Sequence, residues 1–414
     1  MEKTFDLIND LYFVRTGGSK EELKAAKIIE ERVKALGIND VKLEEFDVDG
    51  YNPLEAKLVI DSKSFDCVCV GMSGETPKEG IEGELAYVDS LEKAKILDLK
   101  DKICLIHSKI VNAKLYKELI NKQVKGIILA TGSVYKDASD VDLDPYMYRE
   151  KNYELGKIPA VCIRMKDAYN IIKNDLKKAF IIVRQNEFKN KSHNVVATIK
   201  GIKDDVVCFT AHYDSVPYSR GAYDNATGSA GILDILAYFK DKKPLRTLKF
   251  IWCGSEEMGL LGSKAYVAMH KDELDKYVLN INIDMIATTL GYDIACVTAE
   301  DNLVHYINYL GAITGFAIKA RQGVYSSDST PFADGGVPSL SFARISPQGG
   351  PTIHSHDDVI DFLDEKNYLE TCNFIEKFSD EMVNAILFPV NRIIPDNMKL
   401  ELDFYNGRKD RPEK

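Results

Sequence analysis

From Ser192 onward, short apolar runs alternate with longer segments whose apolar residues recur at helical spacing. This alternation limits the possible folds more than any other feature, because strands that alternate with helices form a sheet covered by helices on both faces. We therefore predict an α/β domain here. The expected strands lie within residues 193–201, 206–214, 247–257, 277–287, 292–298 and 339–345, and the expected helices within residues 228–241, 263–270, 302–314 and 367–387.

The first 48 residues contain one clear helix and no core of their own. Residues 19–37 have helical spacing, Ser19 and Glu22 form a capping box, and Gly37 supplies a left-handed stop. We expect this part to pack on the α/β domain. Together with residues 190–390 it forms the predicted catalytic domain.

Residues 49–189 differ from the sequence on either side. They contain many short β-type runs and one helical segment at 112–123, which predicts a compact, mostly-β domain inserted into the first one. The polar loop at 131–157 is expected to be exposed. Residues 391–414 form a C-terminal extension, which we expect to be frayed.

Composition excludes some classes of protein. The formal net charge of -10 argues against nucleic acid as a partner, and no apolar stretch reaches the roughly 18 residues that span a bilayer. The N-terminus lacks the pattern of a secretory signal, and the eight cysteines lie mostly in apolar runs, as buried free thiols do. We expect a cytoplasmic protein without membrane contact; the oligomeric state is left open.

Histidine and acidic residues gather where the predicted strands end, which is where open α/β sheets build their sites. Taken singly, each group has an ordinary explanation, such as a surface ion pair, a solvated acidic turn or a loop histidine. Taken together, two histidines and three carboxylates are a donor set that zinc accepts. The five segments are residues 212–214, 221–225, 255–259, 282–285 and 354–358.

The order and spacing of these segments resemble the M28 family of zinc aminopeptidases. The resemblance rests on His-x-Asp, Gly-x-x-Asp-Asn-Ala-x-Gly, a Glu-Glu pair before Gly-Leu-x-Gly-Ser, an Asp at a strand end, Ser-Asp-x-x-Pro-Phe and a final His-Ser-x-x-Asp. It spans residues 1–48 and about 192–388, and implies a mixed β-sheet sandwiched by helices, as in zinc exopeptidases. Residues 49–189 resemble a protease-associated (PA) domain, on weaker motifs.

The resemblance implies two Zn²⁺ ions. Asp224 would bridge the two ions. His212 and Asp284 would complete the coordination of one ion, and Glu257 and His354 would complete that of the other. The three carboxylates and one bridging hydroxide, the expected nucleophile, would bring the charge of two zinc ions near neutrality.

Two further residues have implied catalytic roles. Glu256 would be the general base, because a carboxylate that accepts the proton of water cannot also ligate a metal. Asp214 would hold the ring of His212. The expected substrates are peptides with a free N-terminus, which an acidic site and a net charge of -10 favour.

Several alternatives stay open. A carboxypeptidase or an M20-like amide deacylase would use a similar site, a glutaminyl cyclase-like transferase would use one zinc ion, and a binding scaffold would have lost ligands. The sequence also departs from the family at Ser329, where many relatives carry histidine. This change removes no ligand but alters the surroundings of the site.

Overall fold

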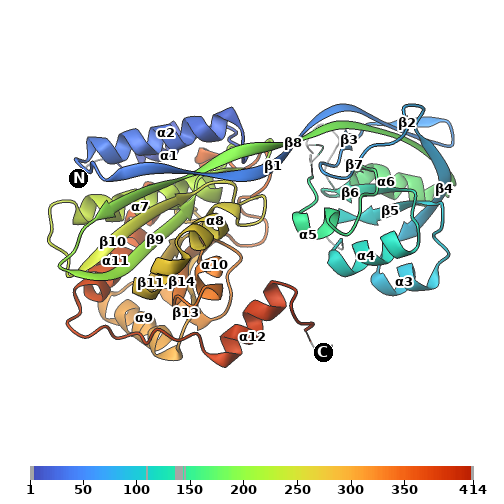
Figure 1. The fold of residues 1–414 in the computed structure, drawn as a ribbon. Helices are drawn as coiled ribbons and strands as arrows, with labels where there is room; N and C mark the ends of the chain where they lie inside the picture. Colours follow the sequence, from blue (N-terminus) through green and yellow to red (C-terminus); the bar gives the residue numbers. More distant parts are fainter. Residues whose placement is uncertain (1–3, 109–110, 136–142, 144–145, 412–414) are drawn as a thin grey trace. The chain divides into compact units, whose positions relative to one another are not determined.

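The computed structural model describes residues 4–108, 111–135, 143 and 146–411 (Figure 1). The chain divides into two compact units. One comprises Met1–Val48 and Lys191–Lys414, and the other comprises Asp49–Asn190. Strands β1 (Val41–Ile60) and β8 (Lys178–Ile199) each continue from one unit into the other.

The first unit is built on a mixed sheet in the order β13-β12-β14-β11-β9-β10-β8. The central strands β14, β11, β9 and β10 run parallel, whereas β12 pairs with β14, and β10 with β8, in antiparallel register. The predicted mixed sheet between helices is therefore confirmed. The strands are β9 (Lys203–His212), β10 (Arg246–Cys253), β11 (Tyr277–Ile283), β12 (Tyr292–Thr298), β13 (Ile318–Gln322) and β14 (Ser339–Ile345).

Both faces of this sheet are buried, as the alternating side chains of β9 illustrate. Val207 and Phe209 belong to a core shared with α1, α2, α7, α9 and α11, whereas Val206 and Cys208 belong to one shared with α8, η4 and α10. The helices are α1 (Asp6–Asp10), α2 (Lys20–Ala35), α7 (Thr227–Phe239), α8 (Leu261–Met269), η4 (Lys271–Lys276), α9 (Asp301–Thr314), α10 (Ser329–Asp334) and α11 (Glu365–Asn384). Two short turns are η3 (Ala222–Ala226) and η5 (Ile360–Phe362).

The predicted N-terminal helix is α2, and it packs on the α/β domain as expected. The Ser19 hydroxyl accepts a hydrogen bond from the Glu22 amide, which is half of the predicted capping box. The other half is wrong: the Glu22 carboxylate does not reach back to Ser19 but is buried against other segments.

The second unit has parallel strands β4, β5, β6 and β7, with β3 antiparallel to β7 and β8 antiparallel to β4. The expectation of one helical segment is wrong, because four helices lie among the described residues of this unit, and parallel strands need such crossovers. The strands are β2 (Lys63–Phe65), β3 (Val68–Cys69), β4 (Ile81–Val88), β5 (Ile103–His107), β6 (Gly126–Thr131) and β7 (Ala160–Arg164). The helices are α3 (Leu91–Ile96), α4 (Ala113–Asn121), α5 (Glu150–Tyr153) and α6 (Met165–Lys173).

Two expectations about polar segments need correction. Part of the 131–157 loop, at 136–142 and 144–145, lies outside the described residues, but Tyr148 and Asn152 are buried. The C-terminal extension forms helix α12 (Asp396–Tyr405), whose Met398 and Leu402 pack on Ala333.

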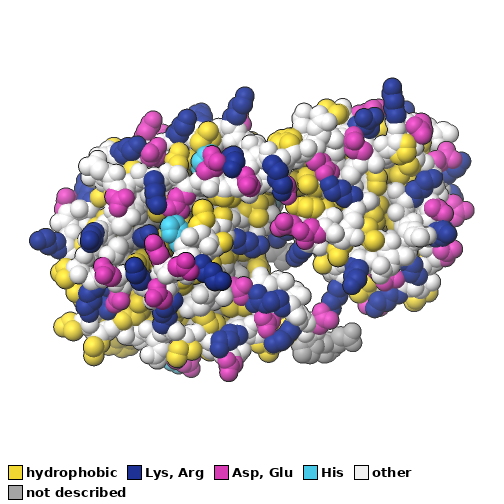
Figure 2. All heavy atoms as spheres, in the orientation of Figure 1, with side chains coloured by type: hydrophobic (Ala, Val, Ile, Leu, Met, Phe, Trp, Pro, Cys, Tyr) yellow, Lys and Arg dark blue, Asp and Glu magenta, His cyan; other side chains and the backbone are white. Residues whose placement is uncertain are grey.

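Charged side chains of both signs are interspersed on the face seen in Figure 2. Of the eight cysteines, seven are buried and all are free thiols, as expected. Within the part of the chain that the structure describes, each helix is too short or too polar to cross a membrane.

Candidate metal centre

The sheet brings the predicted site residues to one edge. His212 is the last residue of β9, Glu256 and Glu257 follow β10, and Asp284 follows β11. Because these three strands are parallel neighbours, their carboxyl ends lie together. Asp224 lies in η3, directly before α7, and His354 lies in the loop after β14.

Asp224 lies between the two histidines. Its Oδ1 is 3.1 Å from His212 Nε2, and its Oδ2 is 3.1 Å from His354 Nε2. Each carboxylate oxygen thus faces a different imidazole. A carboxylate that shares its oxygens in this way is suited to bridge two metal ions, each with one histidine.

The remaining two predicted ligands sit one on each side of Asp224. Glu257 Oε2 is 3.1 Å from His354 Nε2, and Asp284 Oδ1 is 3.7 Å from His212 Nε2. The five predicted ligands therefore form two overlapping groups, and His212, Asp224 and Glu257 offer atoms all within 4.8 Å of one another.

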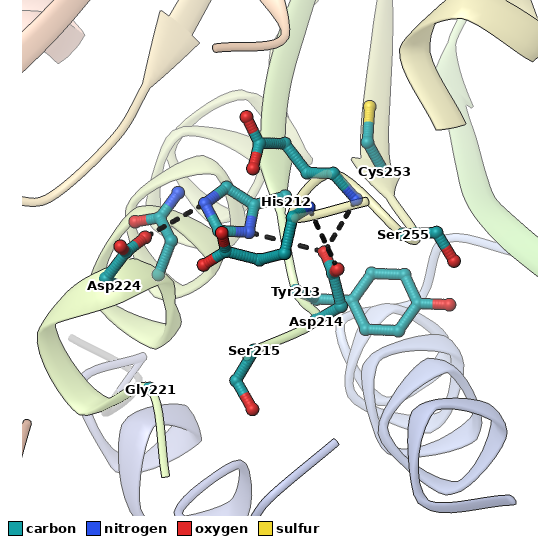
Figure 3. Close-up of polar contacts among 12 residues, drawn as sticks. His212, Tyr213, Asp214, Ser215, Gly221, Asp224, Cys253 and Ser255 are labelled. Carbon is teal, nitrogen blue, oxygen red and sulfur yellow. Dashed lines mark hydrogen bonds and ion pairs between the residues drawn. The ribbon is translucent and has the colours of Figure 1, made fainter. Parts of the chain in front are cut away.

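Asp214 contacts His212 (Figure 3). Its Oδ1 is 3.4 Å from Nδ1 of His212, the ring that Asp214 is expected to hold. The same carboxylate also accepts hydrogen bonds from the amides of Glu256 (3.0 Å) and Glu257 (3.2 Å), which the sequence did not predict. Asp214 thus positions both the strand end of β9 and the turn after β10.

The pKa values in the site are strongly shifted. Burial disfavours the charged form of His354, but its contacts with Asp224 and Glu257 raise its pKa to about 11. Burial, with the charge of Asp224, raises the pKa of Glu257 to about 7. Burial opposes ionisation of Asp224 too, yet both histidines hold its pKa below the usual range. In the metal-free protein, protons on histidine therefore balance the carboxylates, a role that a bound cation would take over.

The chemistry of the residues fits zinc. Glu257 Oε1 and Asp284 Oδ1 are buried and lack a hydrogen-bond partner among the described residues. A buried carboxylate oxygen without a partner is costly unless a cation compensates it. Imidazole and carboxylate are the nitrogen and oxygen donors that zinc accepts in proteins.

Three other residues hold the ligands in place and were not assigned a role from the sequence. The buried side chain of Arg15 donates to the carbonyls of Tyr213 and Gly221. Asn225 donates to the Ile283 carbonyl and accepts from the Met285 amide, which ties η3 to the segment of Asp284. The spacing of the final motif singled out Asp358; its carboxylate accepts from the amides of Tyr223 (2.7 Å) and Asp224 (3.1 Å).

Two buried polar groups near the ligands lack hydrogen-bond partners among the described residues. These are the Tyr325 hydroxyl and the carboxylate of Asp328. Burial raises the pKa of Asp328 to about 6, against the opposing charge of His212. Ser329, the departure from the family pattern, directs its hydroxyl to Ser341 at 2.8 Å and contacts none of the predicted ligands through a hydrogen bond that the structure records.

The chain resembles known peptidases over most of its length. It is 28% identical over 383 residues to the aminopeptidase YwaD of Bacillus subtilis (strain 168), covering 88% of this chain and 80% of that protein. It is 26% identical over 391 residues to carboxypeptidase Q of Bos taurus, covering 87% of this chain and 80% of that protein.

Solved structures share the fold. A zinc aminopeptidase from Bacillus subtilis, BSAP, superposes with a TM-score of 0.78 at 23% identity, covering 94% of this chain and 96% of that one. A peptidase M28 precursor from Shewanella amazonensis SB2B gives 0.75 at 22% identity, covering 96% of each chain.

Residues 194–378 match the family described as peptidase family M28. This segment contains all five predicted metal ligands as well as Asp214 and Glu256. The expectation of an enzyme of the M28 peptidase type is thereby confirmed. Over residues 194–378, which include the whole predicted site, the chain is therefore similar to peptidase family M28.

Proposed function

We propose that this protein is a dizinc aminopeptidase, which hydrolyses the first peptide bond of a peptide with a free N-terminus. One observation carries the two-metal part of the proposal: the two oxygens of Asp224 each lie 3.1 Å from a different histidine. His212 and Asp284 would hold one ion, Glu257 and His354 the other, and Asp224 both. Bound zinc would supply a Lewis acid that polarises the substrate carbonyl and lowers the pKa of water.

Glu256 is the proposed general base. It is almost fully buried, and burial raises its pKa well above the ordinary value, against the opposing charge of His212. A carboxylate with a raised pKa is a better proton acceptor at neutral pH, and afterwards a ready donor to the leaving amine. Its amide is held by Asp214, which limits the directions that the side chain takes.

The choice of peptide end is the part of the proposal that most needs a test. The aminopeptidase relative favours the N-terminus, whereas the carboxypeptidase Q relatives favour the other end as a second candidate. A free ammonium group suits a site with several carboxylates, which can hold it by charge-assisted hydrogen bonds.

A mixed-sequence peptide and its N-acetylated and C-amidated forms, followed by mass spectrometry, separate the two candidates. We expect stepwise N-terminal shortening of the free and amidated peptides, and an intact acetylated peptide. Shortening from the C-terminus, or rapid cleavage of the acetylated peptide, would favour the carboxypeptidase candidate or an endopeptidase.

We also propose that the catalytic domain comprises residues 1–48 and 190–390, and that residues 49–189 are an inserted PA-like domain. The runs at residues 99–103, 126–128 and 158–161 support the second assignment. Residues 126–128 begin strand β6, whereas the other two runs overlap β5 only at Ile103 and β7 at residues 160–161. These three strands pair in parallel.

A further inference from the structure

Glu22 is a buried carboxylate that neither the family resemblance nor the predicted chemistry uses. It lies in the first turn of α2, and its relative exposure is 1%. Four donors surround its two oxygens. Oε2 accepts from the Gly18 amide at 2.7 Å, and Oε1 accepts from the hydroxyls of Ser192 and Ser255, each at 2.9 Å, and from the Ser255 amide at 2.7 Å.

Ser255 occupies a backbone conformation that favours glycine. Its φ is +52°, in the left-handed region, and it directly precedes Glu256 and Glu257. The backbone at Ser255 therefore determines the direction in which both glutamates leave β10. Glu22 contacts Ser255 through its amide and its hydroxyl, so that it holds both the backbone and the side chain of this residue.

The space around this contact is filled. A Cβ atom on Gly17 would lie 2.6 Å from the Ser255 hydroxyl, and a Cβ atom on Gly254 would lie 2.9 Å from Glu22 Oε1. Small residues on both sides thus allow the N-terminal segment to approach the turn closely. Buried carboxylates accept hydrogen bonds from three successive amides of this turn. Glu22 accepts from the Ser255 amide, and Asp214 accepts from the amides of Glu256 and Glu257.

We propose that Glu22 is a positioning residue of the metal centre, which fixes the left-handed turn at Ser255 and so directs Glu257 toward the metals and Glu256 toward the substrate. This inference rests on the proposed function.

The test compares Glu22→Gln with Glu21→Gln, an exposed neighbour on the same helix. Glutamine keeps the size of the side chain, but its amide group adds a donor opposite the donors that surround Glu22. We expect Glu22→Gln to lower the affinity for the more weakly bound zinc ion about tenfold to a hundredfold, as measured by competition with a chelator. The kcat should fall by a similar factor, while KM changes less than about threefold.

Glycine at position 255 supplies an internal control, because it adopts a positive φ without strain. If Glu22 acts through this turn, adding Ser255→Gly to Glu22→Gln restores a large part of the lost zinc affinity. If Glu22 only stabilises the fold, Glu22→Gln should lower the thermal midpoint alone. The zinc affinity of this variant should then stay within about twofold of that of the Glu21→Gln protein. Either that result or a double variant without any recovery would overturn the proposal. If the protein binds two zinc ions but cleaves no peptide, the proposed function fails, while the zinc comparison still decides the role of Glu22.

Discussion

Glu256 and Glu257 are adjacent in the chain, but their surroundings differ. Glu257 contacts His354, whereas Glu256 is proposed to face the substrate. Glu256→Gln should lower kcat by at least about a hundredfold and leave two zinc ions bound, because it removes only proton transfer. Glu257→Gln should release one ion. Elemental analysis beside the assay checks both, and loss of zinc from the Glu256→Gln protein would show that the roles are reversed.

The last motif contains two histidines two residues apart. His354 contacts Asp224 and Glu257, whereas His356 lies 3.3 Å from Asp357 with 44% of its side chain exposed. We expect His354→Ala to lose one zinc ion and the activity, and His356→Ala to keep both. Zinc retention by the first variant together with loss by the second would mean that the motif has been assigned in the wrong register.

The sequence indicated the residues that are proposed to carry the chemistry, but not the residues that hold them in place. The motifs that contain Asp224 and His354 have fixed local spacing, so they can be recognised in the sequence alone. Glu22 is separated from Ser192 by 170 positions and from Ser255 by 233, and only the folded chain brings them together. Arg15, likewise, is a single arginine in an apolar stretch until its carbonyl partners are known.

Helices α7 and α11 bring two acidic residues together. Burial and the charge of Asp234 on α7 raise the pKa of Glu376 on α11 to about 7. A carboxyl whose pKa is raised on folding favours the folded state below its unfolded pKa, and this contribution is lost as the pH rises toward about 7.

Glu376→Gln removes this titration, since glutamine stays neutral. Its thermal midpoint should therefore rise relative to that of the wild-type protein between about pH 4.5 and pH 7, with the gap widening as the pH increases. Thermal scans across this range check the expectation. A gap that is constant with pH would show that Glu376 has the same pKa in the folded and unfolded chains.

Helix α12 is part of the folded domain rather than a loose tail. Leu402 is 2% exposed in a cluster with Ala333 and Met398, whereas Leu400 on the same helix is 40% exposed. Leu402→Ala should lower the free energy of unfolding by about 2–4 kcal/mol. Leu400→Ala is the matched control and should change it by less than about 0.5 kcal/mol in urea denaturation. Equal effects would indicate that α12 does not contribute a packed core.

Strongly periodic elements were predictable, and short or polar ones were not. Helix α2 and the central strands were located from apolar spacing. Strand β13 was missed, because this edge strand has the alternating polar sequence of Ile318–Gln322. Helices α3 and α5 are six and four residues long, too short to show a helical period.

For the whole molecule, the alternation of strands and helices predicted a sheet between helices, but it did not determine the strand order. That order matters, because it makes β9, β10 and β11 parallel neighbours and thereby gathers four site residues at one edge. The divided catalytic domain was predicted because residues 49–189 differ in pattern from both flanks. The pairing of β8 with β4, which involves residues far apart in sequence, was outside what local pattern can predict.

We propose that two zinc ions held by His212, Asp224, Glu257, Asp284 and His354 support removal of N-terminal residues. A zinc titration checks this proposal: zinc is added stepwise to metal-free protein, and release of the first residue from an unblocked peptide is measured. We expect no activity without metal and maximal activity near two zinc equivalents per chain. Full activity at one equivalent, or no release of the first residue at any zinc level, would contradict it.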